Sequence, residues 1–243
     1  MKIIVEPDYE SMSRTAGLLI GKEVRKNPNI VLGLATGSTP IGTYKQLIRM
    51  YKEENLDFSN AISFNLDEYI GLEDTDKNSY RYFMDNELFN EINIKSTNTN
   101  VPSGTADDME KYCELYDTMI DEVGGIDLQV LGIGANGHIA FNEPADALCM
   151  GSFIVNLTKE TINANSRFFD SIDEVPKTAI SMGIGSILKA KKIILLANGK
   201  GKADIIKKML EDKKITTQIP ASFLLLHQDV TLIVDEDAYS LVK

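Results

Sequence analysis

The sequence is poor in cysteine, in basic charge and in long apolar runs, and each shortage excludes a class of function. Cys113 and Cys149 are the only cysteines among 243 residues, and they suit a reducing compartment and offer no metal-ligand spacing. The net charge of −11 argues against nucleic acid as a partner, because neutralising a phosphate backbone takes clustered lysine and arginine. No apolar run approaches the roughly 20 residues that a membrane helix needs. The N-terminus lacks the apolar core of a signal peptide, so we expect a cytoplasmic protein.

The rest of the composition is that of an ordinary globular protein, with 43% hydrophobic and 25% charged residues. We expect one domain over residues 1–243, because no linker, repeat or low-complexity tract interrupts the chain. The acidic balance leaves room for a small anionic substrate. A few basic groups and helix N-termini can make one pocket positive on an acidic surface.

Apolar runs of strand length alternate with stretches of helical periodicity along the whole chain. The expected strands are 2–5, 29–35, 61–66, 126–131, 192–197 and 230–234. The expected helices are 8–26, 40–48, 80–91, 107–123, 178–189 and 202–210, with Thr39 as N-cap and Pro40 as first residue of the second. This alternation predicts an α/β fold, with a mostly parallel sheet and helices on both faces. Residues 144–176 show no strong period and are predicted as loops or a flap over the site.

The loop after the strand 126–131 contains Gly132, Gly134 and Gly137, which match the dinucleotide pattern G-x-G-x-x-G. That pattern requires a helix to begin within the glycines, so that its N-terminus meets a pyrophosphate. Here Pro144 follows closely and disfavours helical geometry before it. We therefore expect no nucleotide cofactor.

The same loop carries His138 and Glu143, which favour acid–base chemistry. Histidine exchanges protons near neutral pH, and a nearby carboxylate can fix its tautomer. The alternative is a core histidine satisfied by hydrogen bonds, although glycines at a strand end favour a site. The other histidine, His227, is interpreted as structural.

Two further strand ends have features of phosphate sites. Gly37, Ser38 and Thr39 join a buried strand to a helix start, where backbone N–H groups bind anions. Lys202 adds positive charge at another helix start, and Arg167 in the flap region is a second candidate clamp. The alternatives are a capped helix without ligand, a solvated lysine and a surface arginine.

A last strand end carries Asp67 and Glu68. Successive side chains of a strand point to opposite faces, so only one of the two carboxylates need face a site. The alternative is a pair of solvated acids in a turn. The residues alone thus indicate an enzyme that acts on a phosphorylated small molecule by acid–base chemistry, with no metal or nucleotide evident.

The segments LGLATGSTPIGTY, SFNLDEYIGL, LGIGANGHIAFNEP, NANSRFF and ANGKGKA closely resemble the glucosamine-6-phosphate deaminase family, over about residues 30–235. The resemblance implies a Rossmann-like, doubly wound fold and conversion of glucosamine 6-phosphate to fructose 6-phosphate and ammonia, without metal or organic cofactor. His138 would open the sugar ring, supported by Glu143 and Asn136. Asp67 would move a proton from C2 to C1.

The resemblance also assigns Ser38, Thr39, Arg167 and Lys202 to the substrate phosphate, beside Gly37. Some family members carry Asp in place of Asn136, and the longer allosteric relatives carry basic residues in the stretch of Phe153 and Val155 and extend further at the C-terminus. We therefore expect a non-allosteric monomer or small homo-oligomer. Two alternatives are a 6-phosphogluconolactonase-like hydrolase, which would not need Asp67, and a sugar-phosphate-sensing domain.

Overall fold

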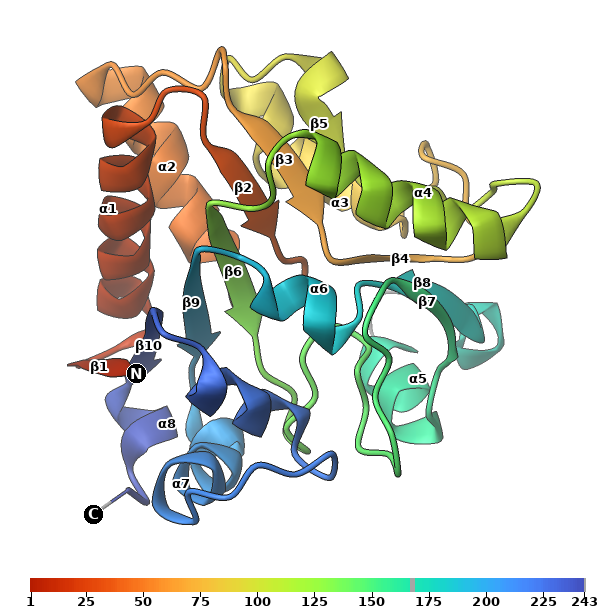
Figure 1. Ribbon diagram of the computed structural model, residues 1–243. Coiled ribbons are helices and arrows are strands. Elements are labelled where there is room, and N and C mark those ends of the chain that lie inside the picture. Colours follow the sequence, from red (N-terminus) through yellow and green to blue (C-terminus); the bar gives the residue numbers. More distant parts are fainter. Residues whose placement is uncertain (167–168, 243) are drawn as a thin grey trace.

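The centre of the molecule is a seven-stranded parallel sheet, seen in the computed structural model, which describes residues 1–166 and 169–242 (Figure 1). The strand order is β1-β10-β9-β6-β2-β3-β5, and every neighbouring pair is parallel. The strands are β1 (Lys2–Glu6), β2 (Val31–Leu34), β3 (Ile62–Asn65), β5 (Thr99–Asn100), β6 (Leu128–Gly132), β9 (Lys192–Ala197) and β10 (Val230–Asp235).

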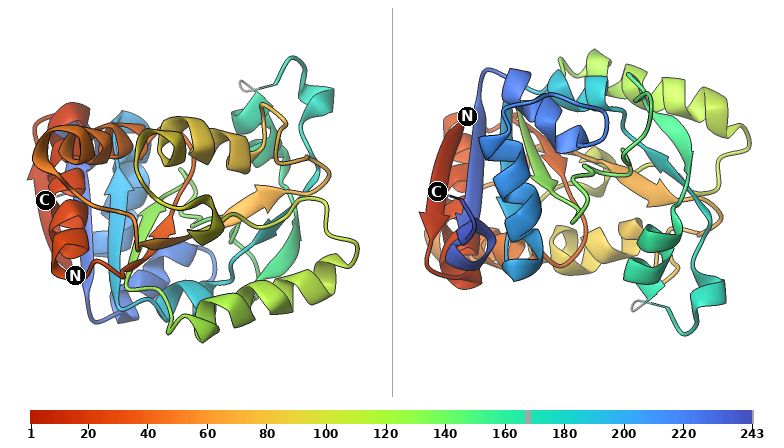
Figure 2. Two further views of the ribbon diagram at one scale, coloured as in Figure 1. Left: turned by 90° about the horizontal axis from the view of Figure 1, so that it is seen from above. Right: turned by 90° about the horizontal axis from the view of Figure 1, so that it is seen from below.

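Helices cover both faces of this sheet (Figure 2). Buried side chains of α1 (Tyr9–Lys26), α2 (Ile41–Glu54) and α3 (Tyr80–Glu87) pack on one face. Those of α4 (Met109–Glu122), α6 (Ile184–Leu188), α7 (Ala203–Glu211) and α8 (Glu236–Tyr239) pack on the other. The predicted α/β class with a mostly parallel sheet is confirmed.

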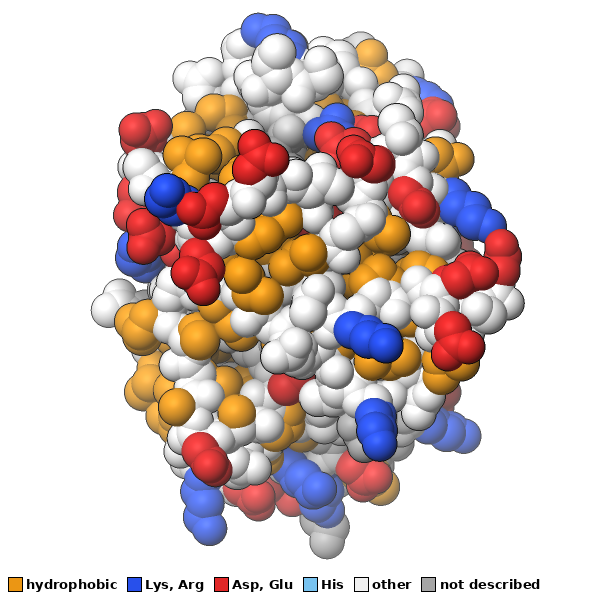
Figure 3. Space-filling view, turned by 90° about the vertical axis from the view of Figure 1, so that its right-hand side faces the viewer, with side chains coloured by type: hydrophobic (Ala, Val, Ile, Leu, Met, Phe, Trp, Pro, Cys, Tyr) orange, Lys and Arg blue, Asp and Glu red, His pale blue; other side chains and the backbone are white. Residues whose placement is uncertain are grey.

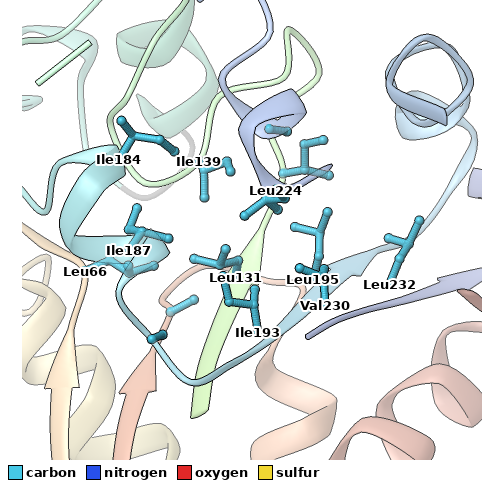
Figure 4. Close-up of a cluster of buried hydrophobic side chains, with 14 of the residues drawn as sticks. Leu66, Leu131, Ile139, Ile184, Ile187, Ile193, Leu195, Leu224, Val230 and Leu232 are labelled. Atoms are coloured by element: carbon cyan, nitrogen blue, oxygen red, sulfur yellow. The ribbon is translucent and has the colours of Figure 1, made fainter. Parts of the chain in front are cut away.

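The two faces are separated by the alternation of side chains along the strands. Leu131, Ile193 and Leu195 face the α4 and α6 side, where they pack with Ile187 and Leu224 (Figure 4). Leu128, Val130 and other strand residues face the opposite side. Each such side chain contributes about 1.5–3 kcal/mol when fully buried, so the sheet is held firmly under the loops at its edge.

A second, three-stranded antiparallel sheet lies beside the carboxyl end of β3, in the order β4-β8-β7. Its strands are β4 (Asp67–Tyr69), β8 (Thr178–Ser181) and β7 (Phe153–Asn156), and one residue, Leu66, separates β3 from β4. On this side of the molecule, apolar side chains gather in the middle and charged side chains surround them (Figure 3).

Three predictions about local structure were wrong. Residues 178–189 form β8 followed by the short helix α6, because residues 178–181 pair with β7 and residues 179–181 also pair with β4. The stretch 144–176 contains β7 and the helix α5 (Lys159–Asn165). The N-cap of α2 is Pro40 rather than Thr39, whose hydroxyl donates to Asn198 instead.

The chain reverses its direction of winding between β2 and β6, which are neighbours in the sheet but far apart in sequence. From β2 it proceeds outward through β3 and β5, and from β6 it proceeds the other way through β9 and β10. Ligands of open α/β sheets bind at the carboxyl ends of strands at such a switch point. Within the described ranges, no helix is long and apolar enough to cross a membrane.

Candidate active site

The carboxyl ends of β2, β3 and β6 open into a pocket of about 730 Å³. Loops after these strands form most of its wall, and the small sheet and α5 close it from the other side. The residues that line it are Ala35, Thr36, Gly37, Ser38, Thr39, Leu66, Asp67, Tyr80, Gly132, Ile133, Gly134, Ala135, Asn136, His138, Ala140, Phe141, Thr161 and Lys202. Predicted site residues from four separate segments thus meet in one cavity.

The loop after β6 holds His138 against Glu143, as their spacing predicted. His138 Nδ1 lies 3.2 Å from Glu143 Oε2. The imidazole lies over Gly134, where an added Cβ would come within 2.5 Å of three of its ring atoms. Glycine at this position is therefore a steric requirement of the histidine.

Asn136 supports this pair through the carboxylate and the backbone. Its Nδ2 donates to Glu143 Oε2 over 2.7 Å, and its Oδ1 accepts from the backbone N–H of His138 over 3.1 Å. One asparagine thus holds the glutamate and the start of the histidine segment at a fixed separation. An amide can do this because it offers both a donor and an acceptor.

Glu143 is largely buried and has a third partner, the hydroxyl of Thr161, which donates to Oε1. Burial by itself raises the pKa of Glu143. The hydrogen bond and charge of His138, with the bonds from Thr161 and Asn136, outweigh burial and lower the pKa to about 2. Glu143 is therefore ionised at neutral pH, and a carboxylate facing Nδ1 favours the tautomer with its proton on that nitrogen.

Asp67 and Glu68 point to different places, as strand alternation predicted. Asp67 lines the pocket, and burial, followed by the charge of Glu68, raises its pKa from 3.8 to about 8. Glu68 instead accepts three backbone N–H groups, from Tyr69, Tyr80 and Arg81. Glu68 therefore caps the start of α3, and Asp67 is the carboxyl group that is free to meet a ligand.

The loop between β2 and α2 presents backbone donors to the pocket. Gly37 adopts a φ of +92°, which favours glycine. Within the described part of the chain, the N–H groups of Gly37, Ser38 and Thr39 have no hydrogen-bond partner. Three such donors beside a helix N-terminus are able to bind an anion.

Lys202 brings a cationic side chain to the same pocket from the loop after β9. This loop is tied to the first one by the Thr39 hydroxyl, which donates to Asn198 Oδ1 over 2.9 Å. The backbone N–H of Gly199 donates to Asp235, which fixes the loop from behind. The predicted second clamp, Arg167, lies outside the described residues.

Three residues of the site escaped sequence reasoning. Thr161 reaches Glu143 from α5, and Tyr80 and Phe141 stack in the wall with ring centroids 6.3 Å apart. No local pattern marks Thr161 or Tyr80, because their neighbours in the pocket come from distant segments. Phe141 lies in the loop of His138, where a single apolar residue gives no signal of a site. Among the described residues, no group of three or more His, Cys, Asp or Glu side chains is placed to hold a metal ion.

The fold and the site define an α/β enzyme with acid–base groups beside a loop that presents backbone N–H donors. The profile of the family described as glucosamine-6-phosphate isomerases/6-phosphogluconolactonase matches residues 10–233. The chain belongs to this family.

Within this family, the chain is similar to relatives that are named glucosamine-6-phosphate deaminases. The chain is 56% identical over its full length to the glucosamine-6-phosphate deaminase of Clostridium perfringens strain 13, covering 100% of both chains. It is 54% identical over 242 residues to that of Thermoanaerobacter sp. strain X514, covering 100% of this chain and 95% of the relative.

Solved structures agree with this placement. A monomeric glucosamine-6-phosphate deaminase superposes with a TM-score of 0.97 at 46% identity, over 99% of this chain and 100% of that one. The 6-phosphogluconolactonase from Trypanosoma brucei superposes with a TM-score of 0.77 at 17% identity, over 100% and 98%. The second likeness shows a shared fold alone.

Proposed function

We propose that the chain converts glucosamine 6-phosphate to fructose 6-phosphate and ammonia. The observation that carries the proposal is the meeting of Asp67 with the His138–Glu143 pair in one pocket beside an anion-binding loop. Relatives at 52–56% identity that are named glucosamine-6-phosphate deaminases support the choice of substrate. An aldose–ketose isomerisation needs a base at the ring hydroxyl and another at carbon, and the pocket provides both types.

The first step is opening of the sugar ring by His138. Its Nδ1 lies 3.2 Å from Glu143 Oε2, which favours the proton on Nδ1 and leaves the lone pair on Nε2 to accept the proton of the C1 hydroxyl. The same nitrogen returns the proton to the ring oxygen as the C1–O5 bond breaks, which gives the open-chain aldehyde. The ionised Glu143 stabilises the imidazolium that forms between the two transfers.

The second step is proton transfer by Asp67 between adjacent carbons. The carboxylate removes the proton from C2, and the aldehyde oxygen takes a proton from the ammonium group of the substrate as the electrons shift, which gives an enolamine. The proton held by Asp67 then returns to C1. The resulting iminium at C2 takes up water and releases ammonia, leaving the ketone. A pKa of about 8 suits this role, because a base is most effective when its pKa lies near the working pH.

The phosphate of the substrate is assigned to the loop after β2 and to Lys202. The N–H groups of Gly37, Ser38 and Thr39 and the Ser38 hydroxyl donate to the phosphate oxygens, and Lys202 balances their charge. The family resemblance assigns Arg167, which lies outside the described residues, to the same phosphate. Holding the phosphate keeps C1 and C2 in register with Asp67 and His138. Unphosphorylated glucosamine should therefore be a poor substrate.

We also propose that residues 1–243 act as one catalytic unit, because both sheets contribute to the same pocket. Asp67 comes from the small sheet and the anion loop follows a strand of the large one. The high likeness to a structure described as monomeric supports a monomer or small homo-oligomer. Sedimentation velocity measures the oligomeric state directly.

The test is incubation with glucosamine 6-phosphate and measurement of ammonia and fructose 6-phosphate. Equal amounts of both products are expected, with loss of both in Asp67→Asn. Hydrolysis of 6-phosphogluconolactone, run in parallel, tests the lactonase alternative. Lactone hydrolysis without ammonia release would overturn the proposal, and binding of the sugar phosphate without either reaction would favour a sensing domain.

A further inference from the structure

A tyrosine from outside the pocket is hydrogen-bonded to the anion-binding loop. The hydroxyl of Tyr9, the first residue of α1, donates to the backbone carbonyl of Ser38 over 3.1 Å. The same hydroxyl accepts from the backbone N–H of Gly42 over 2.9 Å. Gly42 is the second residue of α2, whereas Ser38 lies in the loop that precedes it. Tyr9 thus connects the loop to the helix that follows.

The position of Tyr9 follows from the fold. Strands β1 and β2 are parallel, so α1 and α2, which follow them, both begin at the carboxyl edge of the sheet. Asp8 caps α1 by accepting from the N–H of Ser11 over 2.7 Å, which makes Tyr9 the first helical residue. Helical side chains lean toward the helix N-terminus, so the phenol extends toward the start of α2.

The two helices approach closely enough for this contact because glycines lie between them. A Cβ at Gly42 would come within 2.3 Å of Ser13 Oγ and 3.1 Å of the Tyr9 hydroxyl. A Cβ at Gly17 would come within 2.5 Å of Gln46. The contact between Tyr9 and the loop is therefore part of a tight helix pair and not a chance meeting of surface side chains. Figure 1 shows the two helices side by side.

The Ser38 carbonyl belongs to the same peptide unit as the N–H of Thr39. In a planar trans peptide these two groups point in opposite directions, and the described chain has no cis peptide bonds. A hydroxyl that holds the carbonyl therefore also sets the direction of the Thr39 N–H, which is one of the unpartnered donors of the loop. At the start of the loop, the Tyr44 hydroxyl holds the Ala35 carbonyl in the same manner.

We propose that Tyr9 is a positioning residue that orients the anion-binding loop toward the substrate phosphate. The proposal rests on the assignment of this loop to the phosphate. Tyr9 touches neither the sugar nor the reacting atoms, so its loss should weaken binding of every phosphate ligand to a similar extent. A loss of binding that is equal for the ground state and the transition state raises KM and leaves kcat nearly unchanged.

The variant Tyr9→Phe removes the hydroxyl and keeps the ring. Losing one neutral hydrogen bond that orients a donor should raise the KM for glucosamine 6-phosphate about three- to tenfold, with kcat changed less than about twofold. The Kd of inorganic phosphate and that of fructose 6-phosphate, both measured by calorimetry, should rise by a similar factor. The matched control is Tyr51→Phe, which makes the same chemical change near the far end of α2 and should leave all three constants unchanged.

Calorimetric stoichiometry and a thermal melt separate this role from a purely structural one. A structural tyrosine would lower the melting temperature or the fraction of binding sites and leave the Kd of the folded protein as it was. Unchanged Kd and KM in Tyr9→Phe would overturn the proposal, as would a fall in kcat without a rise in KM. The calorimetric measurements of Kd do not depend on turnover. Absence of ammonia release from the wild type would therefore reject the proposed reaction but leave the proposed role of Tyr9 open to test.

Discussion

Replacing Asp67 by Asn should strongly lower activity and stabilise the folded protein at the same time. Asp67 is buried, with a relative exposure of 7%, and among the described residues no group donates a hydrogen bond to its carboxyl group. Its pKa of about 8, against 3.8 ordinarily, means that the folded state holds a proton which the unfolded state has lost. The unfolded state therefore binds fewer protons between these pH values, and stability falls as pH rises through this window.

Each pH unit in this window lowers the free energy of unfolding by up to about 1.4 kcal/mol for one such group. From pH 5 to pH 8 the wild type should lose up to about 4 kcal/mol through Asp67, whereas Asp67→Asn, which cannot ionise, loses none of it. We expect the variant to be more stable by about 2–4 kcal/mol at pH 8, with the gain growing from pH 5 and levelling off above pH 8.

Urea unfolding at pH 5, 6, 7, 8 and 9 gives the free energies, and release of ammonia gives the activity. The activity of Asp67→Asn should fall on the order of 10²–10⁴-fold. Asp107→Asn, at an exposed position, is the matched control and should show neither effect. An active variant would refute the role of Asp67 in proton transfer. A variant whose stability tracks that of the wild type at every pH would refute the raised pKa of the buried carboxyl group.

Three further predictions concern the rest of the site. Glu143→Gln removes a carboxylate whose pKa is lowered to about 2 in the folded protein. Urea unfolding should therefore show a free energy of unfolding that is lower by about 1–3 kcal/mol at pH 7, and this difference should shrink as the pH falls below 4.5. Gly134→Ala should lower kcat at least about tenfold in the ammonia assay, because its Cβ would displace the His138 ring, while circular dichroism stays unchanged. Lys202→Met should raise the KM for glucosamine 6-phosphate about tenfold or more.

Each of these has an outcome that contradicts it. A stability difference for Glu143→Gln that is the same at pH 3 and pH 7 would mean that the carboxylate is not held ionised by its partners. Full activity in Gly134→Ala would mean that the ring position is not what the glycine provides. An unchanged KM in Lys202→Met, next to the exposed control Lys45→Met on α2, would remove this lysine from the phosphate site.

The parts of the site that the sequence predicted lie within single segments. His138 and Glu143 are five residues apart in one loop, and alternation along one strand separated Asp67 from Glu68. The predicted strand 192–197 matches β9 in both bounds, because a continuous apolar run followed by a glycine turn predicts a strand from local sequence alone. These are local properties, so local reasoning is sufficient.

The misassigned stretches were those whose structure depends on distant partners. Residues 178–181 have apolar spacing that suits a helix, but pairing with β4 and β7 gives them strand geometry. Short apolar runs cannot be assigned by period alone, because the hydrogen bonds that decide them come from elsewhere in the chain. The same holds for β7, whose partners lie some twenty-five residues further on.

The sequence by itself determined the strand–helix alternation, the acid–base loop and the strand end that carries Asp67, because backbone preference and side-chain alternation act between near neighbours. Tertiary structure decided which of these groups share a pocket and how they ionise. Burial makes Asp67 a weak acid, and the contacts of Thr161 and Asn136 keep Glu143 charged. The Tyr9 contact with the loop likewise exists only because two helices begin at one sheet edge. Desolvation and hydrogen bonding depend on the surroundings in space, which no single segment contains.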